Sequence, residues 1–173
     1  PLLAQHIDPI DTGTLVDIFR DDPHSSLLGT DALRDGVDVP GDSLRLVVME
    51  GVPWPKPTIL HKARRAAFAP LFPNEDGGNR GGTGMNGYDD FIIRSRMAQA
   101  FGRLIRHGDD TGRFVLLSAA VPSRLLTAFP AGTPIRRVTL DEAVADVRSS
   151  LSAATKSAQR GEESLAMPDV ATD

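Results

Sequence analysis

The chain is organised around residues Gln99–Arg106, which read Gln-Ala-Phe-Gly-Arg-Leu-Ile-Arg. A helix here, with about 100° of turn per residue, gathers cationic and amide side chains within about 80° of one another. This row consists of Arg96, Gln99, Arg103 and Arg106. An apolar stripe on the opposite side consists of Ile93, Met97, Phe101 and Leu104. Together the two patterns predict a helix with one face in a core and a row of guanidinium and amide groups on the other.

Two interpretations of the arginine row remain open. No Asp or Glu lies between Phe91 and Arg106 to neutralise it. Arg suits phosphate because its planar fork donates two hydrogen bonds at once. On the other hand, the helix dipole also favours cations near a helix C-terminus, and an exposed Arg face can simply keep a domain soluble. The surrounding sequence has to decide between them.

Length and composition indicate one globular domain. The 173 residues are 40% hydrophobic and 24% charged, and aromatic residues make up only 5%, so the core must consist mainly of aliphatic side chains. The net charge of -4 is no global signature of nucleic-acid binding, so any anion site must be local.

The absence of Cys excludes disulfides and iron–sulfur ligation from this segment. With no membrane-spanning apolar run and no signal peptide, the sequence predicts a cytoplasmic protein without membrane contact.

Strand and helix patterns alternate along the chain. Apolar runs predict strands at residues 26–29, 44–49, 113–118 and 135–138. Capping residues predict helices that begin after Asp11, Thr58 and Thr139, the last with a capping box formed by Thr139 and Glu142. A short helix is also expected at Ser123–Phe129. The alternation predicts an α/β fold with a mainly parallel sheet and helices on both faces.

The domain is expected to cover residues 1–154 and to be followed by a disordered tail over 155–173, where the composition turns polar and small. Residues 73–87 are predicted to form a flexible glycine-rich insertion. This insertion lacks the Lys-Ser/Thr pair of a Walker A loop and follows no strand, so we do not interpret it as a phosphate loop. Four strands are few for a complete sheet, and the chain starts inside an apolar run, so we expect truncation at the N-terminus.

A loop rich in Asp and Gly, Gly29–Gly41, directly follows the first predicted strand. Ligands bind in open α/β sheets where strands end. The polar side chains that can orient a sugar hydroxyl or an attacking water there are Thr30, Asp31, Asp35 and Asp38. Asp and Gly are also ordinary turn residues, and their spacing matches no metal-binding loop, so no metal site is predicted.

Basic residues cluster on the helix predicted after the proline-rich segment Val52–Pro57. Lys62, Arg64 and Arg65, next to His61, can contact a nucleic-acid backbone. The alternative is a solvated helix face, which is the more frequent role of such a cluster.

Three of these stretches, taken in order, resemble one family. Gly29–Gly41 resembles motif V of the DinG/XPD-type superfamily 2 DNA helicases, and Val52–Pro57 resembles the family's proline-rich turn. Gln99–Arg106 matches motif VI, with the pattern Gln-x-x-Gly-Arg-x-x-Arg. The resemblance extends from about Ser25 to Val147. It implies the second, C-terminal RecA-like domain of an ATP-dependent DNA helicase.

The resemblance also implies roles for individual residues. Arg103 and Arg106 correspond to arginine fingers that reach ATP held by the first domain, and Gln99 assists at the nucleotide. Gly36 and Asp38 belong to the loop that couples nucleotide to DNA. The predicted DNA contacts are Thr30, Asp31 and Arg34 of the same loop, together with Lys62, Arg64 and Arg65 of the basic cluster described above. The chain departs from the family where an aromatic pair and Glu usually precede Gly-Val-Asp, because it has Leu33, Arg34 and Asp35 there.

Further parts of such a motor are implied outside this segment. ATP with Mg²⁺ would be bound mainly by an N-terminal helicase domain, and any iron–sulfur cluster would also lie there. The expected partners are single-stranded DNA or DNA junctions, as in DNA repair, and that N-terminal domain. Walker A and the Asp-Glu box are absent, so this segment alone is expected to hydrolyse no ATP. Two alternatives remain: a catalytically inactive RecA-like module that binds nucleic acid or a partner, and an unrelated anion-binding domain.

Overall fold

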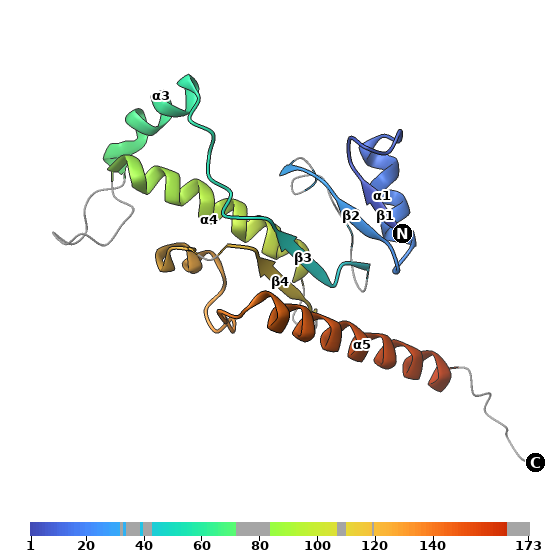
Figure 1. Ribbon diagram of the computed structural model, residues 1–173. Coiled ribbons are helices and arrows are strands. Elements are labelled where there is room, and N and C mark those ends of the chain that lie inside the picture. Colours follow the sequence, from blue (N-terminus) through green and yellow to red (C-terminus); the bar gives the residue numbers. More distant parts are fainter. Residues whose placement is uncertain are drawn as a thin grey trace, which may run out of the picture. The chain divides into compact units, whose positions relative to one another are not determined.

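A computed structural model describes residues 1–31, 33, 39, 43–71, 84–106, 110–118 and 120–165 (Figure 1). The chain divides into two compact units, Pro1–Pro134 and Ile135–Asp173. The strands are β1 (Leu2–Ala4), β2 (Ser26–Leu28), β3 (Leu46–Met49) and β4 (Arg113–Leu116). The α-helices are α1 (Thr12–Asp21), α3 (Ile59–Phe68), α4 (Gly84–Leu104) and α5 (Leu140–Leu165). Two 3₁₀ helices are η2 (Ala69–Leu71) and η3 (Ser123–Ala128). Among these described helices, none has the length and apolar character needed to cross a membrane.

The described strands pair in parallel, as the sequence predicts. Strand β1 pairs with β2, with Leu3 opposite Leu27. Strand β3 pairs with β4, with Val47 opposite Phe114. The predicted α/β fold with parallel strands is therefore confirmed. The strands of the described residues form two two-stranded sheets.

Two strand assignments differ from the sequence prediction. The first residues of the chain, Leu2–Ala4, form β1, which the sequence analysis does not assign. Residues 135–138 form no strand, although their apolar pattern predicts one. Ile135 and Val138 are exposed, and the ladders of the described strands do not include them. A short β-branched run becomes a strand only when a neighbouring strand pairs with it.

Helix starts follow the predicted capping residues. The Asp11 side chain accepts a hydrogen bond from the Thr14 backbone N–H at the start of α1. The Thr58 hydroxyl accepts one from the His61 backbone N–H at the start of α3. Each bond satisfies a backbone donor that has no partner inside the helix. These local signals were sufficient to predict where both helices begin.

Two helices extend beyond their expected limits. Helix α4 begins at Gly84, so residues 84–87 are helical, although they were expected to belong to the insertion; residues 73–83 lie outside the described part. Helix α5 continues to Leu165 and so includes residues 155–165, which were expected to be a disordered tail. Seven of its eleven residues are Ala, Lys, Gln, Arg, Glu or Leu, which have high helix propensity. The proposed extent of the domain, 1–154, stays a prediction.

Two hydrophobic clusters lie within the first unit. One contains Val16, Phe19, Leu33 and Val39, with Leu3 and Leu27 of the β1–β2 sheet packed against it. The other contains Ile93, Met97 and Leu125, with Leu116 and Phe129 packed against it. It forms where α4 contacts β3, β4 and η3. The second cluster therefore sets the position of α4.

Lowering the pH is expected to weaken the start of α5. The Thr139 backbone N–H and hydroxyl donate to the Glu142 carboxylate at 2.8 and 2.9 Å and hold the pKa of Glu142 below its usual value of 4.5. A lowered folded-state pKa means that the stabilisation is complete above pH 4.5 and is lost as the pH falls through the folded-state pKa.

The check is an NMR titration of the Glu142 carboxyl group. The pKa of Glu142 should lie below 4.5 in the wild type and move towards 4.5 in Thr139→Ala. Thr14→Ala is the matched control, because that hydroxyl contacts Asp11 instead. A wild-type value of 4.5 or higher contradicts the prediction.

Candidate functional site

The apolar face of α4 lies where the sequence predicts it. Ile93 and Met97 are fully buried, and Leu104 is 4% exposed. Phe101 is half-buried and packs edge-on against Phe129, with ring centroids 5.4 Å apart. The burial of this stripe follows from helical periodicity, since residues three and four apart share a face.

Arg103 and Arg106 lie together at the C-terminal end of α4. Arg103 is in the last turn, and Arg106 follows the end of the helix at Leu104. The Arg106 Nε donates a hydrogen bond to the Arg103 carbonyl oxygen at 3.3 Å, and the Arg106 backbone N–H donates to the Asp110 carboxylate at 2.7 Å. Both arginine side chains are half-buried. The prediction that Arg106 continues the helical row is wrong, but local contacts keep it beside Arg103.

Gln99 lies one helical turn before Arg103 and is exposed. Residues four apart on a helix are neighbours on its surface, so Gln99 and Arg103 share one face. The end of α4 therefore presents an amide and a guanidinium group on one side, with a second guanidinium group just beyond the helix. These groups donate hydrogen bonds, and guanidinium groups are suited to phosphate oxygens.

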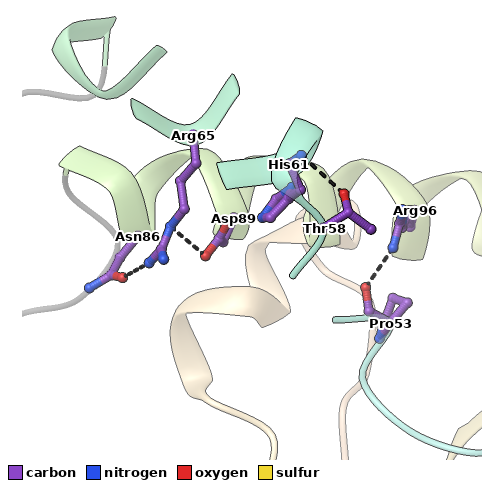
Figure 2. Close-up of polar contacts among 7 residues, drawn as sticks. All are labelled: Pro53, Thr58, His61, Arg65, Asn86, Asp89 and Arg96. Carbon is purple, nitrogen blue, oxygen red and sulfur yellow. Dashed lines mark hydrogen bonds and ion pairs between the residues drawn. The ribbon is translucent and has the colours of Figure 1, made fainter. Parts of the chain in front are cut away.

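Arg96 lies on the same face of α4 and contacts another segment of the chain. Its Nη1 donates a hydrogen bond to the Pro53 carbonyl oxygen at 3.0 Å, in a half-buried contact between α4 and the proline-rich segment (Figure 2). The contact with Pro53 gives Arg96 a structural partner on the side of α4 where the helical wheel predicts an anion. The wheel gives the side of the helix but not the neighbouring segment that lies against it.

The loop after β2 is anchored at its start by a glutamine that the sequence analysis missed. The Thr30 backbone N–H and hydroxyl both donate to Gln5 Oε1 at 3.0 Å. Gln5 is buried, and its Nε2 donates to the Thr12 hydroxyl at 3.1 Å. An added Cβ at Gly29 would lie 1.9 Å from Leu33 Cδ1, so a larger residue there requires the Leu33 side chain to move.

Among the predicted residues of this loop, Thr30 and Asp31 are exposed. Four others lie outside the described residues: Arg34, Asp35, Gly36 and Asp38. Their nucleotide-binding and DNA-binding assignments stay predictions. The hydrogen bonds of Thr30 to Gln5 tie its hydroxyl to the body of the protein.

The three basic residues of α3 do not form one surface. Lys62 and Arg64 are exposed. Arg65 instead reaches α4, where its Nε lies 2.9 Å from Asp89 Oδ2 and its Nη2 donates to Asn86 Oδ1 (Figure 2). Arg65 therefore has a structural partner in the position where the sequence analysis predicted a DNA contact.

Asp89 was not predicted as a site residue, although the sequence contains a signal for it. Residues 51–71 contain four Lys or Arg residues (Lys56, Lys62, Arg64, Arg65) and no Asp or Glu. A half-buried Arg in such a segment needs a carboxylate from elsewhere in the chain. Asp89 supplies it, and its Oδ1 also lies 2.9 Å from His61 Nε2.

The donors at the end of α4 suit only part of a magnesium–nucleotide complex. Gln99, Arg103 and Arg106 can donate hydrogen bonds to phosphate oxygens. Within the described ranges, no group of three or more His, Cys, Asp or Glu side chains could hold a metal ion. The described residues thus fit contact with the phosphates of a nucleotide rather than coordination of its metal.

Comparisons with known proteins match this chain to helicase sequences. A family model described as "Helicase C-terminal domain" matches residues 1–130. The chain is 39% identical over 130 residues to the ATP-dependent helicase DinG of Mycobacterium tuberculosis, covering 74% of this chain and 17% of that protein. It is 30% identical over 119 residues to the ATP-dependent DNA helicase DinG of Photobacterium profundum, covering 66% of this chain and 16% of that protein.

A third relative is named for a different activity. The chain is 30% identical over 120 residues to the 3'-5' exonuclease DinG of Bacillus subtilis, covering 69% of this chain and 12% of that protein. The chain thus spans less than a fifth of the length of each of these relatives. The matched part includes both β-sheets, α4 and the arginines at its end.

Proposed function

Because this chain belongs to the helicase C-terminal domain family and is of the DinG/XPD type, we propose that it is the second motor domain of an ATP-dependent DNA helicase. The observation that carries the proposal is the pairing of Arg103 and Arg106 at the end of α4. Gln99 lies one turn earlier on the same helix. These residues act on ATP that an N-terminal helicase domain of the same protein binds.

The proposed task of the arginine pair is to stabilise charge on the transferred phosphoryl group. The buried stripe of α4 holds the helix in place, so Arg103 is held by a packed element rather than by a mobile loop. Mg²⁺ held by the other domain would neutralise the β- and γ-phosphate oxygens. Since the arginines come from a second domain, hydrolysis requires that the two domains close, and closure couples turnover to movement along DNA.

Two segments are proposed to contact single-stranded DNA. Lys62 and Arg64, which are both exposed on α3, provide cations for the phosphate backbone. Thr30, Asp31 and Arg34 belong to the loop after β2, in which Gly36 and Asp38 are proposed to link the DNA to the nucleotide. The names of the Mycobacterium tuberculosis and Photobacterium profundum relatives support ATP-dependent helicase activity.

The competing function is a RecA-like module that binds nucleic acid or a partner protein without turnover. The Bacillus subtilis relative supports keeping this alternative. It is similar to this chain over 120 residues, but it is named as an exonuclease and not as a helicase. The motor and the inactive module differ in what the rest of the protein must contain. A motor needs a Gly-Lys-Ser/Thr phosphate loop and an Asp-Glu box in its other domain.

The deciding experiment measures ATP hydrolysis by the full-length protein and by this 173-residue chain, each with and without single-stranded DNA. We expect DNA-stimulated turnover from the full-length protein. We expect none from the chain alone, since the arginines then meet no bound triphosphate. A full-length protein that binds DNA without turnover would support the inactive module. Turnover by the chain alone contradicts the proposed division of the site between two domains.

A further inference from the structure

We propose that Asp89 is a positioning residue that couples DNA bound on α3 to the arginine pair at the end of α4. The inference rests on the proposed function. It adds the contacts that connect the DNA bound on α3 with the ATP bound at the arginine pair. It assigns a role to a carboxylate that neither motif V nor motif VI contains. It also assigns Arg65 to this path instead of to the DNA surface.

Asp89 binds two side chains of α3 through its two oxygens. Oδ1 lies 2.9 Å from His61 Nε2, and Oδ2 lies 2.9 Å from Arg65 Nε (Figure 2). The side chains are 14% exposed for His61, 17% for Asp89 and 31% for Arg65. Low exposure reduces screening by water and salt, so these contacts hold the helices together more firmly than a surface ion pair does.

Other contacts restrict how α3 can move on α4. Arg65 Nη2 donates to Asn86 Oδ1, three residues before Asp89. The Tyr88 ring stacks with the rings of His61 and Phe68, whose centroids are 5.8 and 5.5 Å away. We call the four residues His61, Arg65, Asn86 and Asp89 the Asp89 clamp. The clamp leaves α3 little freedom to rotate without breaking a charged contact.

The segment that leads into α3 is held separately. Arg96 Nη1 donates to the Pro53 carbonyl oxygen, two turns along α4 from Asp89. Pro53, Pro55 and Pro57 limit backbone motion between this contact and the Thr58 cap. The proline-rich segment contacts α4 at Arg96, and α3 contacts it at Asp89. Because both ends are held, a displacement of α3 moves α4 instead of bending the segment between Pro53 and Thr58.

Helix α4 extends without interruption from the clamp to Arg103 in its last turn. Asp89 and Arg103 are both in Gly84–Leu104, and at 1.5 Å per residue they are about 21 Å apart along the axis. A continuous helix transmits displacement along its length much better than a loop does. DNA that pulls on Lys62 or Arg64 would thus move the end of α4 towards or away from the triphosphate.

Adjacent arginines of α3 provide a matched test in the full-length protein. Arg64 is exposed, whereas Arg65 is in the clamp. Two quantities are measured with an oligothymidylate: the maximal DNA-stimulated ATP turnover, and the DNA concentration that gives half of it. Arg65→Ala and Asp89→Asn should lower the maximal stimulation about tenfold with little change in the half-saturating concentration.

Arg64→Ala should have the opposite signature. It should raise the half-saturating DNA concentration and lower the slope of log affinity against log salt by about 0.7, while the maximal turnover falls less than in Arg65→Ala, because Lys62 and the Asp89 clamp still connect the DNA to α4. Asp89→Glu retains a carboxylate and should recover part of the stimulation that Asp89→Asn loses. Asp17→Ala breaks an exposed ion pair with Arg20 and should change neither quantity. Thermal unfolding of each variant identifies loss of folding. If Arg65→Ala does not fold, Arg65→Gln is measured in its place.

The outcomes separate the inference from the function on which it rests. A wild-type protein without DNA-stimulated turnover overturns the proposed function, and the coupling role with it. If the wild type is stimulated by DNA and Arg65→Ala behaves like Arg64→Ala, then Arg65 is a DNA contact. That result overturns the inference but not the proposed function. Unchanged stimulation in both Arg65→Ala and Asp89→Asn also overturns it.

Discussion

Replacing Arg106 by Ala in the full-length protein is expected to lower DNA-stimulated ATP turnover by about 10³-fold or more, with DNA affinity nearly unchanged. An arginine finger acts on charge that develops in the transition state, so its loss reduces the turnover number more than it reduces binding. Arg106 is half-buried and lies against the Arg103 carbonyl, so its guanidinium group is held close to the end of α4. Steady-state ATPase assays with saturating DNA measure the effect.

The competing role of Arg106 is to cap the C-terminal end of α4, since its Nε donates to a carbonyl of the last turn. If Arg106 acts only as a cap, Arg106→Ala should lower the free energy of unfolding by about 1 kcal/mol without a specific loss of turnover. Unfolding measurements on the same variant separate the two roles. Arg20→Ala is the matched control, because Arg20 pairs with Asp17 on the surface. Turnover within twofold of the wild type means that the finger assignment is wrong.

Replacing Arg124 by Ala is expected to destabilise the first unit by about 2–3 kcal/mol. Arg124 Nε donates to Asp90 Oδ2 at 2.6 Å, and Nη2 donates to Oδ1 at 3.3 Å, so the pair is bidentate. The Asp90 side chain is 3% exposed, and losing Arg124 leaves its charge without a cation. The cost is below the about 3–5 kcal/mol of a fully buried pair because Arg124 is 38% exposed.

Chemical denaturation of this chain, followed by circular dichroism, measures that destabilisation. Asp90→Ala is the informative partner variant. It leaves the partly exposed Arg124 free to hydrate, so it should cost less than Arg124→Ala. Arg136→Ala is the control, because Arg136 is 70% exposed and lies 3.8 Å from Asp146. Equal stabilities of Arg124→Ala and the wild type would show that the ion pair contributes nothing to the position of η3 on α4.

Several features follow from short-range patterns and were predicted correctly. The buried stripe of α4 results from side chains three and four residues apart, and Ile93 and Met97 are fully buried as expected. The Asp11 and Thr58 caps and the Thr139–Glu142 capping box all form within four residues of chain. The motif VI pattern also identified the family, which the match over residues 1–130 supports.

The errors share a different cause. Arg106 was counted as part of a helix that ends at Leu104, because a wheel has no information about where the hydrogen-bond ladder stops. Residues 135–138 have the apolar pattern of a strand but pair with no described strand. Strand formation depends on a partner from elsewhere in the chain, and composition within four residues does not reveal that partner.

From the amino-acid order alone come the family, through its motifs, and the parallel α/β class, through the alternation of strand and helix patterns. The helix caps and the buried face of α4 also come from it, because these depend on neighbours within about one helical turn. Only the folded chain decides what each basic residue touches. Arg96 meets a carbonyl 43 residues away, and the carboxylate that binds Arg65 also binds His61 from 28 residues away. A charged side chain reaches several ångströms from its backbone, so its partner is chosen by whichever distant segment the packing brings within that reach.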